Sequence, residues 1–567
     1  RPYPYDWRLP LTKASTGDLG TSSVVKAIES MASSSKTGKV TIIAHSNGGL
    51  VTKIVYNELK EKGEAGLVDK VIFVAVPEVG TPQALTSLLH GDNEEIASGL
   101  ILSAGTARGL GVNMPSAYSL LPDQNYFDIV PRAIASFASS TLAGLDFSRY
   151  FPAISSYTKM KSFVDDASHG SLSDSTDIPL VGNAGLFPQA ESVHSVLDSW
   201  KPASTTELVA IAGWGLPTDV GVSYFQRLVC ALDSLLHKKC TYELQRKDVN
   251  DSGDGTVALP SASYSSSTKQ LFDLGAYDSD THQKLAHADI LEADPVETAI
   301  KSDIGAASSS TGIPYITSTI PANYKFPDEL VIDVHSPADI NIYDKDGNHT
   351  GPIPNPIPGS DLDAYENKIP MSFYKETGDG VEVTLPFEPD YKIDLDGTGM
   401  GGVSVDTRVD NFNDSEDIAS SSFVGMIVTP ITHMEFAAST STNADATGSA
   451  AEANSYKVIK IDEDGDGVFD ATATPDVMPN ITSDMYKKSI ENCVHSLHLS
   501  QSDEKNMLAR LDKAWRFAQS DKSGRAEKAF KNLYEKRVHH VRSGRMTDLN
   551  RTEVRGLIEG MLDDMGM

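Results

Sequence analysis

The segment AHSNGG at residues 44–49 constrains the fold of this chain more than any other feature. It follows residues 39–44, a β-branched and apolar run that predicts a buried central strand, and it precedes residues 50–60, which have helical spacing. A serine on a sharp strand-to-helix turn needs small neighbours, because the turn is crowded and the hydroxyl projects outward. We therefore predict that Ser46 is a nucleophile; the alternative is an ordinary turn in which Ser46 is the helix N-cap.

A nucleophilic serine requires a base, and the base requires a carboxylate that orients it. Asp254 lies in a glycine-rich segment, NDSGDGTV, and His287 follows it along the chain. The order Ser, Asp, His is that of α/β-hydrolases and differs from the orders found in other serine proteases. We predict that Asp254 orients His287 as the general base. His282 is the second candidate for the base, and Asp254 could instead be a turn residue or a calcium ligand.

Further short apolar runs at residues 71–76, 207–212 and 269–274 alternate with helical stretches. This alternation predicts an α/β domain over residues 1–305 with a mostly parallel sheet. Residues 115–202, rich in serine, phenylalanine and tyrosine, fit no strand–helix repeat and are interpreted as an insertion. The insertion could form a lid over an acyl-binding cleft, or it could pack as an ordinary helical cap.

Several motifs in residues 1–305 resemble those of bacterial lipases and esterases of the α/β-hydrolase superfamily. The group concerned includes the lecithin–cholesterol acyltransferase-like and GPI-inositol-deacylase-like enzymes. Besides the segment around Ser46 and the histidine His287, the matching pieces are YDWR at 5–8, VGTP at 79–82, MPSAYSLLP at 114–122, GWGLPT at 213–218 and GDGTV at 253–257.

The resemblance implies that Ser46, Asp254 and His287 form a catalytic triad. It also implies that the backbone N–H of Asn47 stabilises the oxyanion, an interaction worth roughly 3–4 kcal/mol in the transition state. In this group a His-Gly turn near the start supplies the second donor, and the sequence opens after that point. We therefore expect the first strands, together with a signal peptide, in a preceding segment or a separate N-terminal fragment.

The remaining residues predict two further domains. Residues 313–479 contain short alternating runs separated by Gly, Pro and Asp turns, which predicts a β-sandwich. Residues 480–567 return to helical spacing and predict a helical bundle. Residues 481–567 carry 16 Lys and Arg against 13 Asp and Glu, in contrast to the acidic remainder. This shift in charge marks a change of module.

The acidic segment DEDGDGVFD at residues 462–470 predicts a structural calcium site in the sandwich. Carboxylates stand at positions 1, 3, 5 and 9 of a calcium loop, while position 12 is an alanine. The alternative is a merely acidic turn. We expect no organic cofactor, and the sequence contains neither a C-x-x-C nor an H-E-x-x-H zinc motif. The predicted calcium ligands are Asp462, Asp464, Asp466 and Asp470.

Overall composition excludes several classes of protein. The chain has 48 Lys and Arg against 78 Asp and Glu, a net charge of −30, which argues against a nucleic-acid partner. The sequence contains no run of 18 apolar residues, the length that would predict a transmembrane helix. We predict a secreted or cell-surface serine carboxylic-ester hydrolase that acts on lipid or other acyl esters. The alternatives are an acyltransferase with the same triad, and a non-catalytic surface-binding protein built on a hydrolase scaffold.

Overall fold

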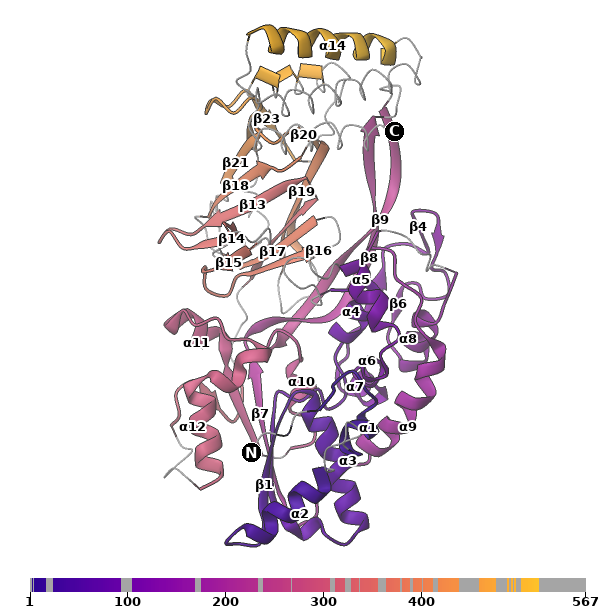
Figure 1. Cartoon of the computed structure of the whole chain (residues 1–567), viewed down its shortest axis with the longest axis vertical. Helices are drawn as coiled ribbons and strands as arrows, with labels where there is room; N and C mark the ends of the chain where they lie inside the picture. The colour runs from indigo at the N-terminus through magenta and orange to yellow at the C-terminus, as the bar shows by residue number, and fades with distance from the viewer. Residues whose placement is uncertain are drawn as a thin grey trace, which may run out of the picture. The chain divides into compact units, whose positions relative to one another are not determined.

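The computed structural model of the chain divides into two compact units (Figure 1). The first unit contains residues 1–226 and 244–326, and the second contains residues 227–243 and 327–567. The residues described are 3–519 except 4, 17–23, 93–103, 169–174, 233–237, 267, 306–311, 322–327, 336, 355–363, 378–379, 388–390, 400, 411–416, 438–457, 476–486, 489–490, 493 and 496–500.

A five-stranded sheet in the order β1-β2-β7-β10-β11 organises the first unit. The first four strands pair in parallel, and the short β11 pairs antiparallel with β10. The mostly parallel sheet expected from the alternating pattern is therefore present. The strands are β1 (Val40–His45), β2 (Val68–Val74), β7 (Glu207–Trp214), β10 (Thr268–Asp273) and β11 (Ile316–Thr317).

Among the described strands, β1 lies at the edge of this sheet and not at its centre. The side chain of Ile43 is 46% exposed, whereas the β2 residues Val71–Val74 are buried. The strand expected at residues 39–44 is present, and in the described part of the chain it has one neighbour, β2. A β-branched apolar run favours strand backbone, but pairing partners decide where the strand lies in the sheet.

Helices lie on both sides of β7 (Figure 1), with α3 and α9 on one side and α11 and α12 on the other. Gly49 allows α3 to approach the end of β2 closely, because a Cβ at this position would clash with the side chain of Val76. The helices around the sheet are α1 (Leu11–Thr16), α2 (Val24–Ser34), α3 (Asn47–Glu61), η1 (Ala65–Leu67), α4 (Gln83–His90), α5 (Ala104–Gly111), α10 (Leu259–Ala262), α11 (Leu274–Thr281), η3 (His287–Glu292) and α12 (Asp294–Asp303).

The insertion is a mixture of short helices and strands, and β3 joins a second sheet in the order β6-β3-β8-β9. The elements of the insertion are α6 (Pro115–Ser119), α7 (Gln124–Ile129), β3 (Ala135–Phe137), β4 (Thr141–Leu142), β5 (Leu145–Asp146), β6 (Ala153–Ile154), α8 (Tyr157–Val164), η2 (Ala184–Leu186) and α9 (Phe187–Leu197). The other two strands of the second sheet, β8 (Leu216–Leu232) and β9 (Lys238–Gly253), follow the insertion in the sequence.

Aromatic side chains of the insertion form a packed core. The ring of Phe137 stacks on Phe147 at 4.9 Å and on Tyr224 of β8 at 5.2 Å between centroids. Most of the aromatic and aliphatic side chains that suggested a lid are buried, while Phe151 is 43% exposed. These rings therefore pack inside the insertion and do not form an exposed apolar surface.

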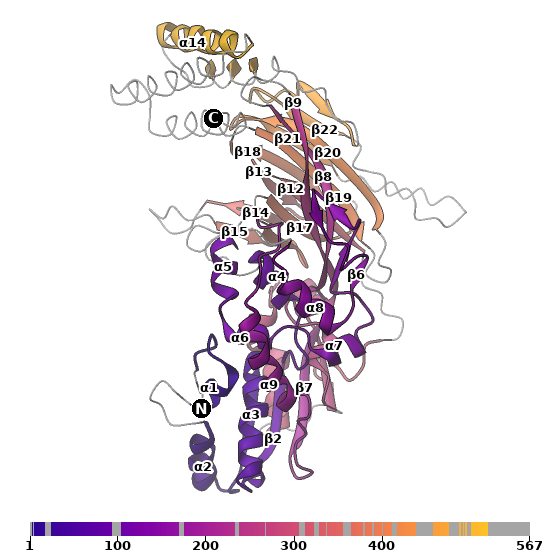
Figure 2. The ribbon, with the colours of Figure 1, turned by 90° about the vertical axis from the view of Figure 1, so that its right-hand side faces the viewer.

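Two antiparallel sheets form the sandwich of the second unit (Figure 2), in the orders β16-β17-β12-β19-β20 and β15-β14-β13-β18-β21-β22-β23. Apolar side chains from both sheets share one buried core. The strands are β12 (Glu329–His335), β13 (Ala338–Tyr343), β14 (His349–Ile353), β15 (Ala364–Asn367), β16 (Phe373–Thr377), β17 (Gly380–Pro386), β18 (Lys392–Gly397), β19 (Gly401–Asp410), β20 (Asp417–Val428), β21 (His433–Ala437), β22 (Ile459–Asp462) and β23 (Ala471–Ala473).

The limits of the domains differ from the expectation at two places. Residues 227–243 lie inside the expected domain at 1–305 but are assigned to the second unit. Residues 313–326 belong with the first unit, because β11 hydrogen-bonds to β10 of the first sheet. In the expected bundle at 480–567, α14 (Gln501–Gln519) is a helix, and most of the remaining residues lie outside the described part of the chain. In the described part, no helix combines the length and apolar character needed to cross a bilayer.

Candidate active site

Ser46 occupies a strained turn between β1 and α3. Its backbone has φ 53° and ψ −135°, a conformation that costs a non-glycine residue about 1–3 kcal/mol. The backbone N–H donates to the carbonyl of Val74 at 3.0 Å, which ties the turn to the end of β2. The Ser46 hydroxyl makes no capping hydrogen bond to α3. The structure therefore does not support the alternative in which Ser46 is a simple N-cap.

His287 links Ser46 to Asp254. Its Nε2 lies 2.7 Å from Ser46 Oγ, and its Nδ1 lies 2.9 Å from Asp254 Oδ2. A carboxylate can only accept, so Nδ1 carries the proton and Nε2 accepts the hydrogen bond from the serine hydroxyl. This is the protonation pattern in which an imidazole can remove a proton from serine.

Asp254 is completely buried and held from several directions. Its Oδ1 accepts hydrogen bonds from the backbone N–H groups of Thr256 at 3.1 Å and Val257 at 2.8 Å. Its carbonyl oxygen accepts from the backbone N–H of His287 at 2.8 Å. A Cβ on Gly213 of β7 would lie 2.7 Å from Asp254 Cβ, so the glycine makes room for the carboxylate.

Two other histidines, His45 and His282, differ in whether they contact the residues of the candidate site. His45, which sequence analysis treated only as part of the turn, donates from Nε2 to the carbonyl of His287 at 2.9 Å. Burial and the neighbouring His287 lower the pKa of His45, which keeps its ring neutral. His282, the second candidate for the base, ends α11 on the surface with φ 55°. Of the two candidate bases, His287 contacts Ser46.

Asn47 is the first residue of α3. The geometry of an α-helix leaves its first N–H groups without partners inside the helix, and the helix dipole places partial positive charge there. The backbone N–H of Asn47 is therefore suited to a developing negative charge beside Ser46.

Residues 1–270 match the family model described as "Lecithin:cholesterol acyltransferase". This similarity covers 270 of the 567 residues. The family match supports a lipid acyl-ester hydrolase or acyltransferase type of activity. No curated protein matches the sequence significantly.

Two solved structures resemble the chain weakly. The Tle4–Tli4 complex has 14% identity and a TM-score of 0.24, over 39% of this chain and 46% of the other. The match therefore spans less than half of that structure. The lipase BlEst2 of Bacillus licheniformis, in its propeptide form, has 11% identity and a TM-score of 0.24, over 73% of this chain and 84% of the other. Both similarities are too weak to bear on function.

Motifs that are far apart in the sequence meet in the first unit. The hydroxyl of Thr81 donates to the carbonyl of Thr256 at 2.6 Å, and the hydroxyl of Ser261 donates to the carbonyl of Gly80 at 2.8 Å. Gly80 has φ 91°, and a Cβ there would clash with the backbone at Leu121. These contacts connect the VGTP segment at 79–82 with the LLP segment at 120–122 and with the GDGTV segment at 253–257.

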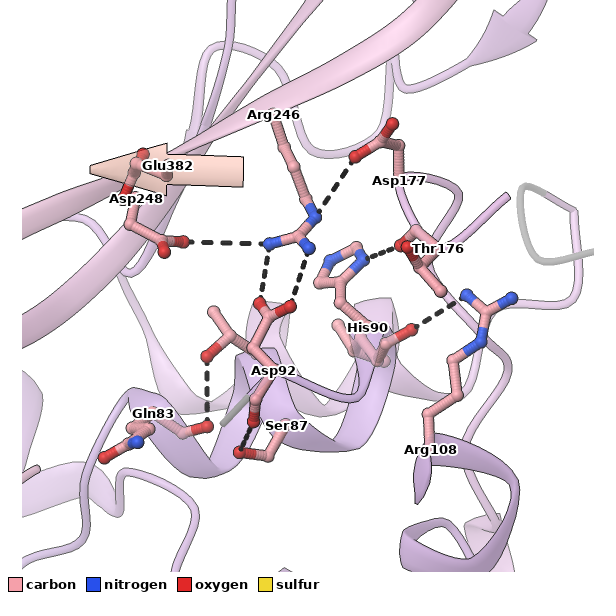
Figure 3. Close-up of polar contacts among 12 residues, drawn as sticks. Gln83, Ser87, His90, Asp92, Arg108, Thr176, Asp177, Arg246, Asp248 and Glu382 are labelled. Atoms are coloured by element: carbon pink, nitrogen blue, oxygen red, sulfur yellow. Dashed lines mark hydrogen bonds and ion pairs between the residues drawn. The ribbon is translucent and has the colours of Figure 1, made fainter. Parts of the chain in front are cut away.

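A buried ion cluster lies in the same domain (Figure 3). The guanidinium of Arg246 makes two 2.6 Å hydrogen bonds to Asp92, and its side chain is 3% exposed. Asp177 and Asp248 lie 3.4 and 3.8 Å from the same guanidinium. Burial alone would lower the pKa of Arg246, but the three carboxylates outweigh it and raise the pKa. Sequence analysis did not identify this cluster, because its members come from three distant segments.

His90 packs against this ion cluster as a neutral ring (Figure 3). Its Nδ1 lies 2.6 Å from the carbonyl of Thr176, and its Nε2 lies 2.8 Å from the hydroxyl of Tyr224. A carbonyl only accepts, so Nδ1 carries the proton and Nε2 accepts from Tyr224. Burial and the positive charge of Arg246 lower the pKa of His90 well below its usual value.

The predicted calcium loop is the turn between β22 and β23 in the second unit. Carboxylate oxygens of Asp462, Asp464 and Asp470 lie within 4.8 Å of one another, and Asp466 is not part of that group. Instead, Asp466 accepts a hydrogen bond from the backbone of Val468 at 2.8 Å. Three carboxylates this close suit a hard cation with oxygen ligands, so the residues present fit calcium.

Proposed function

We propose that this protein is a serine carboxylic-ester hydrolase that acts on lipid or other acyl esters through an acyl-enzyme on Ser46. The contact that carries the proposal is the 2.7 Å approach of His287 Nε2 to the hydroxyl of Ser46. The strained turn at Ser46 and the buried partner Asp254 support the same assignment, because both hold the reacting groups in place before substrate binds.

In the proposed reaction, His287 takes the Ser46 proton while Oγ attacks the ester carbonyl carbon. The carbonyl oxygen becomes an oxyanion that the backbone N–H of Asn47 stabilises. The bond to the alcohol breaks, and His287 returns the proton to the departing alkoxide. Water then attacks the acyl-enzyme by the same steps in reverse, which releases the acid. Asp254 stabilises the imidazolium that forms in each half of the reaction.

Acyl transfer to an alcohol is the second candidate, and the family match of residues 1–270 favours it specifically. The same three residues would act, with an alcohol in place of water in the second half of the reaction. Product analysis with a radiolabelled acyl ester and an added sterol or long-chain alcohol separates the two. New labelled ester indicates transfer, and labelled acid alone indicates hydrolysis.

A fluorophosphonate probe tests the proposed nucleophile. We expect the native full chain to be labelled on Ser46 and the Ser46→Ala variant to lose the label, because the probe reacts with an activated serine hydroxyl. Mass spectrometry of the labelled peptide identifies the residue. Ser33→Ala, which changes an exposed serine of α2, should label like the wild type. Absence of label on the folded wild-type chain would leave a hydrolase-derived surface-binding protein as the better account.

We also propose that the loop at residues 462–470 binds calcium and that the protein works in a calcium-rich, extracellular setting. Position 12 lacks a bidentate acid. We therefore expect a weak site, with a Kd of about 10⁻⁴–10⁻³ M, as in extracellular modules. Calorimetric titration of the full chain with calcium should give this value, and Asp464→Asn should weaken binding at least about tenfold. An unchanged titration in Asp464→Asn would contradict the assignment.

A further inference from the structure

Three side chains of the insertion that could hold a metal ion converge, and none of them belongs to the proposed triad. Asp123 is the N-cap of α7, His194 lies on α9, and Asp198 immediately follows α9. One ligand atom from each lies within 4.8 Å of the other two. The cluster joins the start of the insertion to its end, since Asp123 and His194 are 71 residues apart in the sequence (194 − 123).

The distances in this cluster suit a metal ion better than a hydrogen bond. His194 Nδ1 lies 3.4 Å from Asp123 Oδ2 and 3.5 Å from Asp198 Oδ1. A charged N–H···O hydrogen bond is shorter than either separation, about 2.7–2.9 Å. Two ligand atoms on a tetrahedral zinc ion, each about 2.1 Å from the metal, are about 3.4 Å apart.

Asp123 Oδ2 and His194 Nδ1 are buried, and the contact between them is an ion pair at 3.4 Å. Asp123 is 3% exposed and His194 is 8% exposed. Within the described part of the chain, neither Asp123 Oδ2 nor His194 Nδ1 makes a hydrogen bond. Buried polar atoms without hydrogen bonds are costly, and a bound cation is one way in which proteins satisfy them.

Hydrogen bonds from His194 Nε2 and to Asp123 Oδ1 fix these two side chains, so that His194 Nδ1 and Asp123 Oδ2 face each other. His194 Nε2 donates to the carbonyl of Ser119 at 3.0 Å, so loss of the Nδ1 proton would leave a lone pair at Nδ1 for a metal ion. Asp123 Oδ1 accepts from the backbone N–H of Tyr126 at 2.9 Å, which leaves Oδ2 for the cluster. Metal-binding histidines commonly donate their second ring N–H to a carbonyl in this manner.

We propose that Asp123, His194 and Asp198 bind a zinc ion that ties α9 to the segment connecting α6 and α7. The partly exposed Asp198 provides the route by which the ion enters, and water completes the fourth position of the tetrahedron. The ion holds the two ends of the insertion together, so its role is structural. It takes no part in the chemistry at Ser46.

A proton is the competing occupant. Burial lowers the pKa of His194, but the contacts with Asp123 and Asp198 outweigh burial and raise it to about 9. Without zinc, an imidazolium therefore balances the two carboxylates. A second cluster, Asp394, His433 and Glu435, differs because its groups are engaged elsewhere. There, His433 Nδ1 lies 2.8 Å from Asp396 and Asp394 accepts from Lys392 at 2.6 Å.

Zinc titration of the full chain, after removal of metal with a chelator, tests the proposal. We expect one zinc to bind, with a melting-temperature increase of roughly 4 °C for a unit of this size when zinc exceeds its Kd about 100-fold. Asp198→Asn should weaken zinc binding at least about 100-fold, more than the loss of an outer-shell partner costs. Asp198 is partly exposed, so this variant should fold. His433→Gln is the matched control and should bind zinc like the wild type.

X-ray absorption of the zinc-loaded wild-type chain gives a readout that does not depend on any variant. We expect nitrogen and oxygen ligands, including one imidazole, and no sulfur. Equal zinc affinity of the wild type and Asp198→Asn, loss of binding in His433→Gln, or sulfur ligation would overturn the assignment. Absence of binding to the wild type would do so too, and the cluster would then be a protonated ion triad only.

Discussion

Replacing His287 with alanine is expected to lower kcat for a p-nitrophenyl acyl ester by roughly 10⁶-fold. The imidazole is the group that takes the Ser46 proton, since its Nε2 lies 2.7 Å from Ser46 Oγ. Without it, the hydroxyl remains protonated and attacks slowly. The loss should fall on kcat and leave KM nearly unchanged, because His287 does not hold the substrate in the ground state. Steady-state hydrolysis by the purified full-length variant measures both constants.

The control for this prediction is His282→Asn. His282 ends α11 in the left-handed region with φ 55°, a conformation that asparagine tolerates better than alanine does. This variant should keep wild-type kcat. A large loss in His282→Asn together with activity in His287→Ala would exchange the roles of the two histidines. Circular dichroism of both variants checks that they fold.

Replacing Arg246 with methionine is expected to destabilise the first unit by about 3–5 kcal/mol. The variant leaves Asp92, Asp177 and Asp248 together without the guanidinium that balances them, and Asp92 and Asp248 are almost fully buried. Removing one partner of a buried ion pair costs more than the pair itself contributes, because the remaining charge has lost its water as well. Urea-dependent hydrogen exchange in peptides from residues 1–226 and 244–326 measures the change in unfolding free energy.

Arg132→Met is a matched control for this prediction. Arg132 lies 3.6 Å from Asp251, which is on the same strand β9 as Arg246, but both side chains are about one-third exposed. An exposed ion pair contributes no more than about 1 kcal/mol. Equal destabilisation by Arg132→Met and Arg246→Met would show that burial of the Arg246 cluster has no special weight. Arg246→Lys should fall between them, because lysine keeps the charge but loses the paired hydrogen bonds to Asp92.

The order and spacing of a few motifs pointed to three residues that the structure brings within hydrogen-bonding distance of one another. Ser46 could be recognised because a strand, a small-residue turn and a helix are consecutive in the sequence, and this turn is a local structure. Asp254 and His287 follow in a characteristic order, and the structure places them at 2.9 Å from each other. The sequence could not decide between His287 and His282 as the base, because the two are only five residues apart and both follow Asp254 in the chain.

Position within a sheet was less predictable. The run at 39–44 predicts a strand, because β-branched side chains favour extended backbone, but it does not reveal that β1 has one described neighbour. The aromatic residues of the insertion were likewise ambiguous, because buried cores and exposed lids use the same side chains. Only the structure shows that Phe137 stacks on Tyr224, a residue 87 positions away (224 − 137).

The sequence by itself determined the strand–serine–helix turn, the order of Ser46, Asp254 and His287, and the acidic loop at 462–470. It also determined the change from strand–helix alternation in residues 1–305 to short alternating strands in residues 313–479. These are local patterns, and local backbone preference carries them. Only the tertiary structure revealed the hydrogen bond from His45 to His287, the Arg246 cluster and the convergence of Asp123, His194 and Asp198. Their members come from segments that folding brings together, and burial, which makes an unbalanced charge or an unpaired polar atom costly, is a property of the folded chain alone.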